Sequence, residues 1–181
     1  ITFQNKWVKN GEVLRRDLVH VWKEEQIDEN MKLLEAFDMA IPKIEEGKWI
    51  IPCMLNEKRK GSALDFLKSK YRFERIFKFE MLPQGLIGRL IIRTQNQPNV
   101  KMKECWRTGI SFEVKDEGEG EIEMFHNEIR LRLVTFKKSN LIQQLVQEYC
   151  ALLSSARLVY EQYIVCPHCF KRELKYEDCV G

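Results

Sequence analysis

The sequence predicts an α+β protein in which short helices and strands come first and a larger antiparallel sheet with helices follows. Two stretches, residues 71–80 and 129–136, alternate apolar and charged residues with the period of a half-buried strand. Residues 140–160 instead place apolar side chains on one broad helical face. Because both periods occur in one chain, we expect a mixed fold.

The first part of the chain is expected to form two helices and a hairpin. Apolar residues at helical spacing predict a helix over residues 14–24, and Asp28 is a suitable N-cap for a second helix over residues 28–39. Two short apolar runs, residues 40–44 and 49–51, flank a polar turn and predict a β-hairpin. Helix, helix, hairpin is the order of a winged-helix module. Its expected core contains Leu18, Trp22, Leu34, Phe37 and Trp49.

The second part is expected to form one antiparallel sheet with two helices. After the strand at residues 71–80, Pro83 favours the start of a helix that reaches about Gln95. Gly118 and Gly120 predict a turn. The remaining elements are expected as strands at residues 106–114, 121–125 and 129–136 and as a long helix at residues 140–160 that Asn140 caps.

These patterns divide the chain into three segments. Residues 1–62 are expected to form a winged-helix-like N-terminal subdomain that lacks its beginning, and residues 56–62 form a polar loop at its boundary. Residues 63–165 are expected to form an antiparallel-sheet subdomain with helices. Residues 166–181 remain as a cysteine-containing tail.

The composition is that of an ordinary globular protein. The 181 residues carry 30 basic and 27 acidic side chains, so the net charge of +3 is too small to indicate nucleic-acid binding. No apolar run approaches the roughly 20 residues that a membrane helix needs. The density of the six cysteines is far below that of a disulfide scaffold, which favours a reducing, cytoplasmic location. The start at Ile1 suggests a piece of a longer protein.

Motifs for catalysis are missing from the sequence. It contains no GxxxxGK[ST] stretch, so we expect no nucleotide cofactor to bind in the P-loop manner. His20, His126 and His168 are far apart in the sequence, and the acidic residues 117–123 are expected to form a solvated hairpin. We therefore predict no catalytic residue and no enzyme activity.

The C-terminal segment contains the one metal-like motif. Cys166 and Cys169 have the CxxC spacing with which two thiolates hold one Zn²⁺, His168 lies between them, and Cys179 follows closely. Three thiolates and one further ligand would complete a tetrahedral zinc site. The alternatives are a frayed tail with free thiols and a redox-active pair, although the latter usually lies at a helix N-terminus in a βαβ unit.

A winged helix with a zinc knuckle suggests a nucleic-acid-binding protein as the alternative function. Residues 58–60 form a short basic run, which a solvated loop also explains. The expected recognition helix carries Asp28, Glu29, Glu35 and Asp38 against Lys32 alone, so its face would repel phosphate. We therefore interpret the winged helix as a protein-contact module.

The junction after the strand at residues 71–80 has a distinctive sequence. Proline restricts φ there, glycine permits an unusual backbone angle, and Arg89 and Arg93 are neighbours on one helical face. These two arginines are either solvated or in contact with a partner. The residues that define the junction are Leu82, Pro83, Gly85, Leu86, Arg89, Leu90 and Arg93.

This junction resembles the COR region, the part that follows the Roc GTPase domain in Roco proteins. Residues 11–22, 33–37, 49–52 and 106–110 resemble further passages of that family in the same order, so the resemblance covers about residues 11–165. It implies a non-catalytic regulatory scaffold that couples an adjacent Roc (Ras-like) GTPase domain to the rest of a Roco protein. It also implies self-association, and GTP binding by the neighbouring domain only. The cysteine tail is not part of the family pattern.

Overall fold

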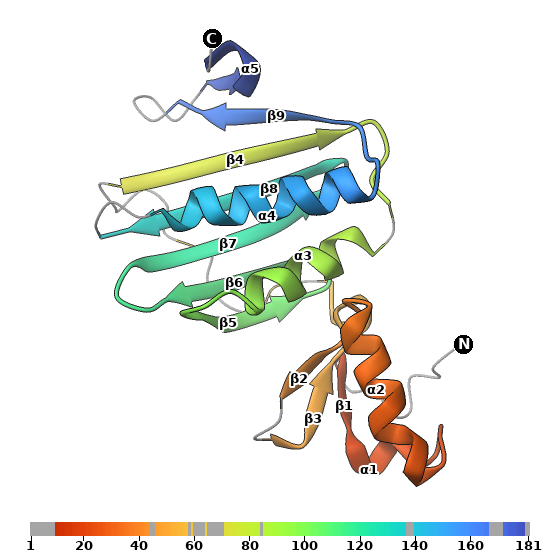
Figure 1. Ribbon diagram of the computed structural model, residues 1–181. Helices are drawn as coiled ribbons and strands as arrows, with labels where there is room; N and C mark the ends of the chain where they lie inside the picture. The colour runs from red at the N-terminus through yellow and green to blue at the C-terminus, as the bar shows by residue number, and fades with distance from the viewer. Residues whose placement is uncertain are drawn as a thin grey trace.

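The structure is a computed structural model that describes residues 10–43, 46–57, 59, 64, 71–83, 85–136, 140–166 and 172–179. Two sheets are arranged end to end, a small one near the N-terminus and a large one that contains most of the chain (Figure 1). All strand pairs are antiparallel. The predicted α+β class, with antiparallel sheets and several helices, is confirmed.

The small sheet has the strand order β1-β3-β2. The predicted hairpin is confirmed as β2 and β3, but β1 on the other side of β3 was not predicted. The helices beside this sheet are α1 and α2, and 3-10 turns lie at Glu24–Gln26 and Pro52–Met54. The bounds are β1 Glu12–Leu14, α1 Arg15–Leu18, α2 Ile27–Ala36, β2 Ile41–Lys43 and β3 Lys48–Ile50.

The predicted helices of this part were too long. α1 ends at Leu18, where the N–H groups of Val21 and Trp22 both donate to the Leu18 carbonyl in a turn. The β-branched residues and His20 that follow Leu18 are weak helix formers, which favours this early end. The N-cap of α2 is Gln26, so Asp28 lies in the first helical turn and pairs with Arg15 instead of capping the helix.

The core of the small sheet differs in part from the predicted one. Leu18 is buried, and Trp22, Leu34 and Trp49 pack against the buried cluster as expected. Phe37 does not, because it follows the end of α2 and keeps 56% of its surface exposed. The buried residues are Val13, Leu18, Ile27, Met31, Ala40 and Ile51.

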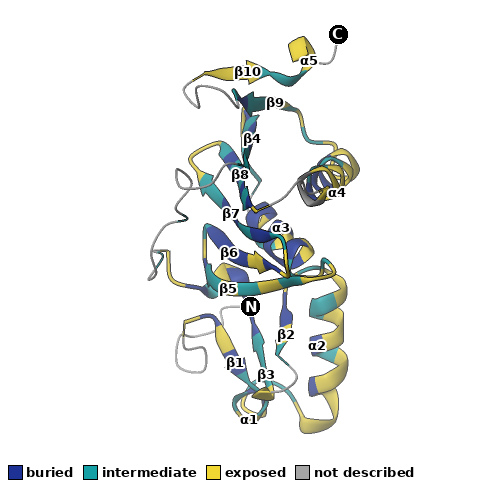
Figure 2. Cartoon of the chain, turned by 90° about the vertical axis from the view of Figure 1, so that its left-hand side faces the viewer, coloured by how far each residue is buried: buried dark blue, intermediate teal, exposed yellow. Residues whose placement is uncertain are grey.

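The large sheet has seven strands in the order β10-β9-β4-β8-β7-β6-β5. α3 and α4 cover the same face, and no helix of the described residues lies on the opposite face (Figures 1 and 2). The bounds are β4 Tyr71–Phe79, α3 Leu86–Gln95, β5 Val100–Trp106, β6 Gly109–Val114, β7 Gly118–Phe125, β8 Glu128–Thr135, α4 Leu141–Ser155, β9 Tyr160–Val165, β10 Glu173–Lys175 and α5 Tyr176–Cys179.

Several boundaries of the large sheet also correct the sequence predictions. Trp106 ends β5 and Gly109 begins β6, so the expected strand at residues 106–114 starts with a hairpin turn. Gly118 and Gly120 lie within β7, where Gly120 leaves room for the ring of Phe112; a Cβ at Gly120 would lie 2.4 Å from that ring. α4 ends at Ser155; the residues 156–159 that were expected to continue it form a turn and a connection, and Tyr160 begins β9.

The core of the large sheet extends into the small sheet. The buried residues Ile41 and Ile50 of the small sheet and Leu55 after it belong to the same cluster as Phe77, Ile110 and the other core residues of the large sheet. β10 is the outer strand of the large sheet, so residues 173–175 of the predicted tail pair with β9. The segment boundaries at residues 62 and 165 remain predictions.

Candidate functional site: the junction and the surfaces around it

Gly85 determines how the chain passes from β4 into α3. Its φ of 83° lies in the left-handed region, and it occupies the N-cap position of α3. A Cβ at Gly85 would meet no atom within 4 Å, so the backbone angle and not the available space requires glycine. Pro83 precedes the helix, contrary to the expected place in its first turn, and its carbonyl accepts the N–H of Leu86. The tight corner fixes the direction of α3 relative to the sheet.

The two candidate contact residues of α3 have different surroundings. Arg89 is exposed, and its N–H donates to the Gly85 carbonyl. Arg93 binds Asp38, which lies just beyond α2, through both Nε (3.0 Å) and Nη2 (2.8 Å). The Asp38 side chain is only 10% exposed and its backbone has a φ of 54°. Arg93 therefore joins the two parts of the chain, whereas the role of Arg89 in a partner contact stays a prediction.

A second arginine, Arg107, joins the two parts from the other side. Its backbone N–H donates to the Asn56 carbonyl, and its Nε donates to the Leu55 carbonyl. Its Nη1 also forms an ion pair with Glu57 at 2.8 Å. Together with Arg93, these contacts hold the residues that follow the small sheet against the end of β5.

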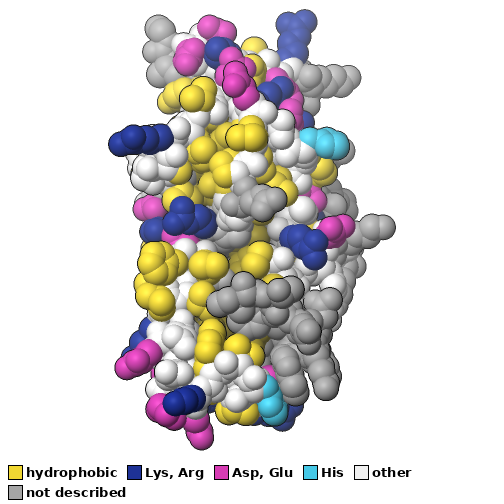
Figure 3. Space-filling view, turned by 90° about the vertical axis from the view of Figure 1, so that its right-hand side faces the viewer, with side chains coloured by type: hydrophobic (Ala, Val, Ile, Leu, Met, Phe, Trp, Pro, Cys, Tyr) yellow, Lys and Arg dark blue, Asp and Glu magenta, His cyan; other side chains and the backbone are white. Residues whose placement is uncertain are grey.

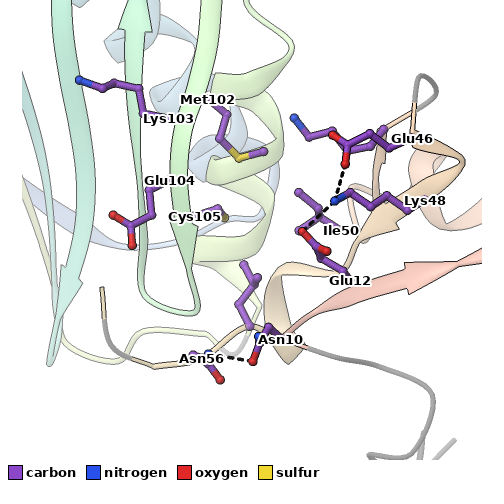
Figure 4. Close-up of a pocket in the computed structure, with 12 residues that line it drawn as sticks. Asn10, Glu12, Glu46, Lys48, Ile50, Asn56, Met102, Lys103, Glu104 and Cys105 are labelled. Carbon is purple, nitrogen blue, oxygen red and sulfur yellow. Dashed lines mark hydrogen bonds and ion pairs between the residues drawn. The ribbon is translucent and has the colours of Figure 1, made fainter. Parts of the chain in front are cut away.

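A cleft of about 370 Å³ lies between β5 and the small sheet (Figure 4). Met102, Lys103, Glu104 and Cys105 line one side, and residues of β1 and β3 line the other. Lys48 binds both Glu12 and Glu46 there, and the hydrogen bond with Glu46 raises the pKa of Lys48. Burial raises the pKa of the Cys105 thiol to about 12, so this cysteine is not a reactive thiolate. The charges of the rim balance, which gives the cleft no marked preference for cations or anions.

A row of charged side chains crosses the face of the large sheet that the helices leave open. The strand register places Glu104, Ser111, Glu121, Arg132 and Glu74 opposite one another on β5, β6, β7, β8 and β4. Arg132 donates from Nε to Glu74 (2.9 Å) and from Nη1 to Glu121 (3.0 Å). Glu121 is only 2% exposed, so the prediction of a solvated acidic hairpin was wrong at this residue.

This ionic row was missed because single strands do not reveal it. Alternating charges in a strand sequence indicate a solvent-facing side, and Arg132 and Glu74 are 58 residues apart. Only the cross-strand register brings opposite charges together. The carboxylates of Glu74 and Glu121 both accept hydrogen bonds from Arg132, so each already has a cationic partner within the sheet.

Hydrophobic side chains form a band on the side of the molecule where β4 ends (Figure 3). The large exposed apolar residues belong to the loops and strand ends of the large sheet and to the segments on and after α1 and α2. Those of the large sheet include Met81 and Val159, each 79% exposed. Those of the first part are Val19, Leu33, Phe37 and Met39. Such a patch is typical of a surface that contacts other proteins.

Of the four candidate zinc ligands in the tail, the described residues include Cys166 and Cys179. Cys166 follows β9 and its N–H donates to the Arg172 carbonyl, while Cys179 ends α5 and is exposed. His168 and Cys169 lie outside the described residues. Within the described ranges no three His, Cys, Asp or Glu side chains gather in a manner suited to a metal ion. Across the same ranges, no helix is both long and apolar enough to cross a membrane.

Comparisons with known proteins give the same assignment as the junction sequence. The family model "C-terminal of Roc, COR-B domain" matches residues 70–180, which is β4 to α5 and more than half of the chain. Curated relatives come from Dictyostelium discoideum. "Probable serine/threonine-protein kinase roco5" is 29% identical over 139 residues, which cover 71% of this chain and 5% of that protein. "Probable serine/threonine-protein kinase pats1" is 26% identical over 135 residues, which cover 65% of this chain and 4% of that protein.

A third relative, "Probable serine/threonine-protein kinase qkgA", is 24% identical over 131 residues, which cover 63% of this chain and 8% of that protein. The chain thus spans a small fraction of the length of each relative. Its seven-stranded sheet with α3 and α4 on one face occupies the stretch that the family model matches. The chain therefore belongs to the COR-B family, the domain found C-terminal of Roc in Roco proteins.

Proposed function

We propose that this chain is a non-catalytic regulatory scaffold that couples an adjacent Roc GTPase domain to the rest of a cytoplasmic Roco protein. The family match over residues 70–180 is the observation that carries this proposal. The missing P-loop supports assigning guanine nucleotide to the neighbouring domain. The GTPase-facing surface is proposed to include Arg89, which is exposed on α3 close to the junction.

We also propose that the first part is a winged-helix-like module used for protein contacts. Its strand β1 is followed by two helices and a hairpin, and β1 pairs with the last strand of that hairpin, which supports the proposal. Exposed Asp28 and Glu29 on α2 disfavour nucleic acid as its ligand, because they would repel phosphate. The exposed apolar residues Leu33 on α2 and Phe37 just after it fit a protein partner better.

The test uses this chain and a separately prepared Roc domain of the same polypeptide. Calorimetry with GTP and with GDP should give no binding to this chain alone. Adding the chain to the Roc domain should produce a complex and change the rate of GTP hydrolysis or nucleotide release. Arg89→Gln should weaken the complex, while Arg16→Gln, at a side chain that is 82% exposed and remote from the junction, should not.

Two results would contradict the proposal. A stoichiometric micromolar affinity of this chain for GTP would show that it is not merely a scaffold. If the Roc domain does not bind the chain, and its rates of GTP hydrolysis and nucleotide release do not change when the chain is added, the coupling role is wrong. Self-association is a separate part of the proposal, and sedimentation of the chain over a range of concentrations measures it directly.

A further inference from the structure

The side chain of Arg59 lies in a socket on the open face of the large sheet. Its guanidinium carbon is 5.0 Å from the centre of the Trp106 ring. Its Nη1 donates to Glu121 at 2.7 Å, and its Nε lies 3.7 Å from a carboxylate oxygen of Glu104. Arg59 belongs to the connection between the small and the large sheet, so a residue of the connection contacts both β5 and β7.

The strand geometry explains why these three side chains surround one guanidinium. The register of β5 shifts between Met102 and Glu104, and this bulge puts Glu104 and Trp106 on the open face together. Trp106 lies opposite Gly109 of β6, and a Cβ at Gly109 would come within 2.6 Å of the Trp106 ring. Glycine at this position therefore makes room for the indole that forms the floor of the socket.

Burial makes the guanidinium important for Glu121. The Glu121 side chain is 2% exposed, that of Arg59 is 16% exposed, and Trp106 is 2% exposed. One carboxylate oxygen of Glu121 accepts from Arg59 and from the Leu64 N–H (3.3 Å), and the other accepts from Arg132. A buried carboxylate is strongly destabilising without its cationic partners, and Arg132 is already shared with Glu74.

The chemistry of the socket distinguishes arginine from lysine. A planar guanidinium can stack on an aromatic face, donate to one carboxylate and form an ion pair with a second, whereas an ammonium group is a compact point charge. We propose that Trp106, Glu104 and Glu121 form a guanidinium-binding site whose resident ligand is Arg59. By holding Arg59, this site fastens the connection between the two parts of the chain to the large sheet.

The test replaces the ligand and then supplies it from solution. Arg59→Gln should lower the melting temperature by about 5 °C or more. It should also speed hydrogen exchange at the Leu64 amide, which shares the carboxylate of Glu121 with Arg59. Millimolar methylguanidinium should restore part of the lost stability and protection, and methylammonium should not. Arg59→Lys should resemble Arg59→Gln more than the unmodified chain.

Arg16→Gln is the matched control, because it makes the same change of charge at an exposed side chain. It should change neither the melting temperature nor the exchange of Leu64, with or without methylguanidinium. The proposal is wrong if Arg59→Gln melts like this control. It is also wrong if methylguanidinium and methylammonium act alike on Arg59→Gln, because a site that selects guanidinium must distinguish them.

Discussion

A buried hydrogen bond between α3 and α4 allows a sharp test of how the COR-B core is held together. The hydroxyl groups of Thr94 and Tyr149 lie 2.5 Å apart, and both residues are 0% exposed. The Thr94 hydroxyl donates to the Leu90 carbonyl at 2.7 Å, so the Tyr149 hydroxyl must donate to Thr94. Burial also raises the pKa of Tyr149, which keeps it a protonated donor.

The direction of this hydrogen bond makes the two single substitutions unequal. Tyr149→Phe removes a donor, while Thr94 keeps its bond to Leu90, so the expected cost is about 1 kcal/mol. Thr94→Val preserves the shape of the side chain but leaves the buried Tyr149 hydroxyl without an acceptor, with an expected cost of about 1–3 kcal/mol. The double variant removes the orphaned hydroxyl, so it should be more stable than Thr94→Val alone.

Urea unfolding of the four proteins, followed by fluorescence and circular dichroism, measures these free energies of unfolding. Because the two residues are in contact, the double-mutant cycle should show a clear departure from additivity. The reasoning would be refuted by costs that simply add, or by a Tyr149→Phe variant that is less stable than Thr94→Val.

The other predictions concern the small core, one carboxylate and the tail. Trp49→Ala should lower the free energy of unfolding by about 2–3 kcal/mol, because the ring packs against the small core and its Nε1 donates to Glu35. Phe37→Ala, at an exposed side chain, should change the free energy of unfolding by less than about 0.5 kcal/mol. Equal effects of the two variants in chemical unfolding would contradict this prediction. Burial, followed by repulsion from Glu121, raises the pKa of Glu123. A raised carboxyl pKa means that stability is lost as pH rises, so Glu123→Gln should raise the melting temperature at pH 7 and lose this advantage below about pH 4. For the tail, metal analysis of a longer chain that extends past Gly181 should find bound zinc, and Cys166→Ser/Cys169→Ser should remove it; equal zinc in both would eliminate the site.

The sequence predicted those elements whose signal is local. β4 and β8 alternate apolar and charged residues along nearly their whole length, and the predicted strands match the observed ones closely. The hairpin of β2 and β3 has its turn glycine within the chain segment that forms it. α3 follows a proline and glycine corner, and its end at Gln95 was predicted.

Elements that depend on distant partners were not predictable in the same way. β1 has three residues and exists because β3, more than thirty residues later, pairs with it. The apolar spacing of α4 continues past Ser155 to Ala156 and Val159, and the change of direction is made by Arg157, which has a φ of 53° without being glycine. The ionic row has the same origin, because its charges belong to four separate strands.

The contacts between the two sheets bear on how a scaffold of this kind could couple its neighbours. Domains that are joined only by a flexible connection move independently, so a contact on one gives no signal to the other. Here Ile50 and Leu55 lie in the core of the large sheet, and Arg93 and Arg107 bind Asp38 and Leu55 of the first part. A partner that displaced α2 would therefore act on α3 through Asp38 and Arg93, and α3 meets α4 at the buried Thr94 hydroxyl. This continuous set of contacts gives the proposed coupling a physical route. The Thr94 and Tyr149 variants would weaken that route without changing an exposed side chain, because both residues are fully buried.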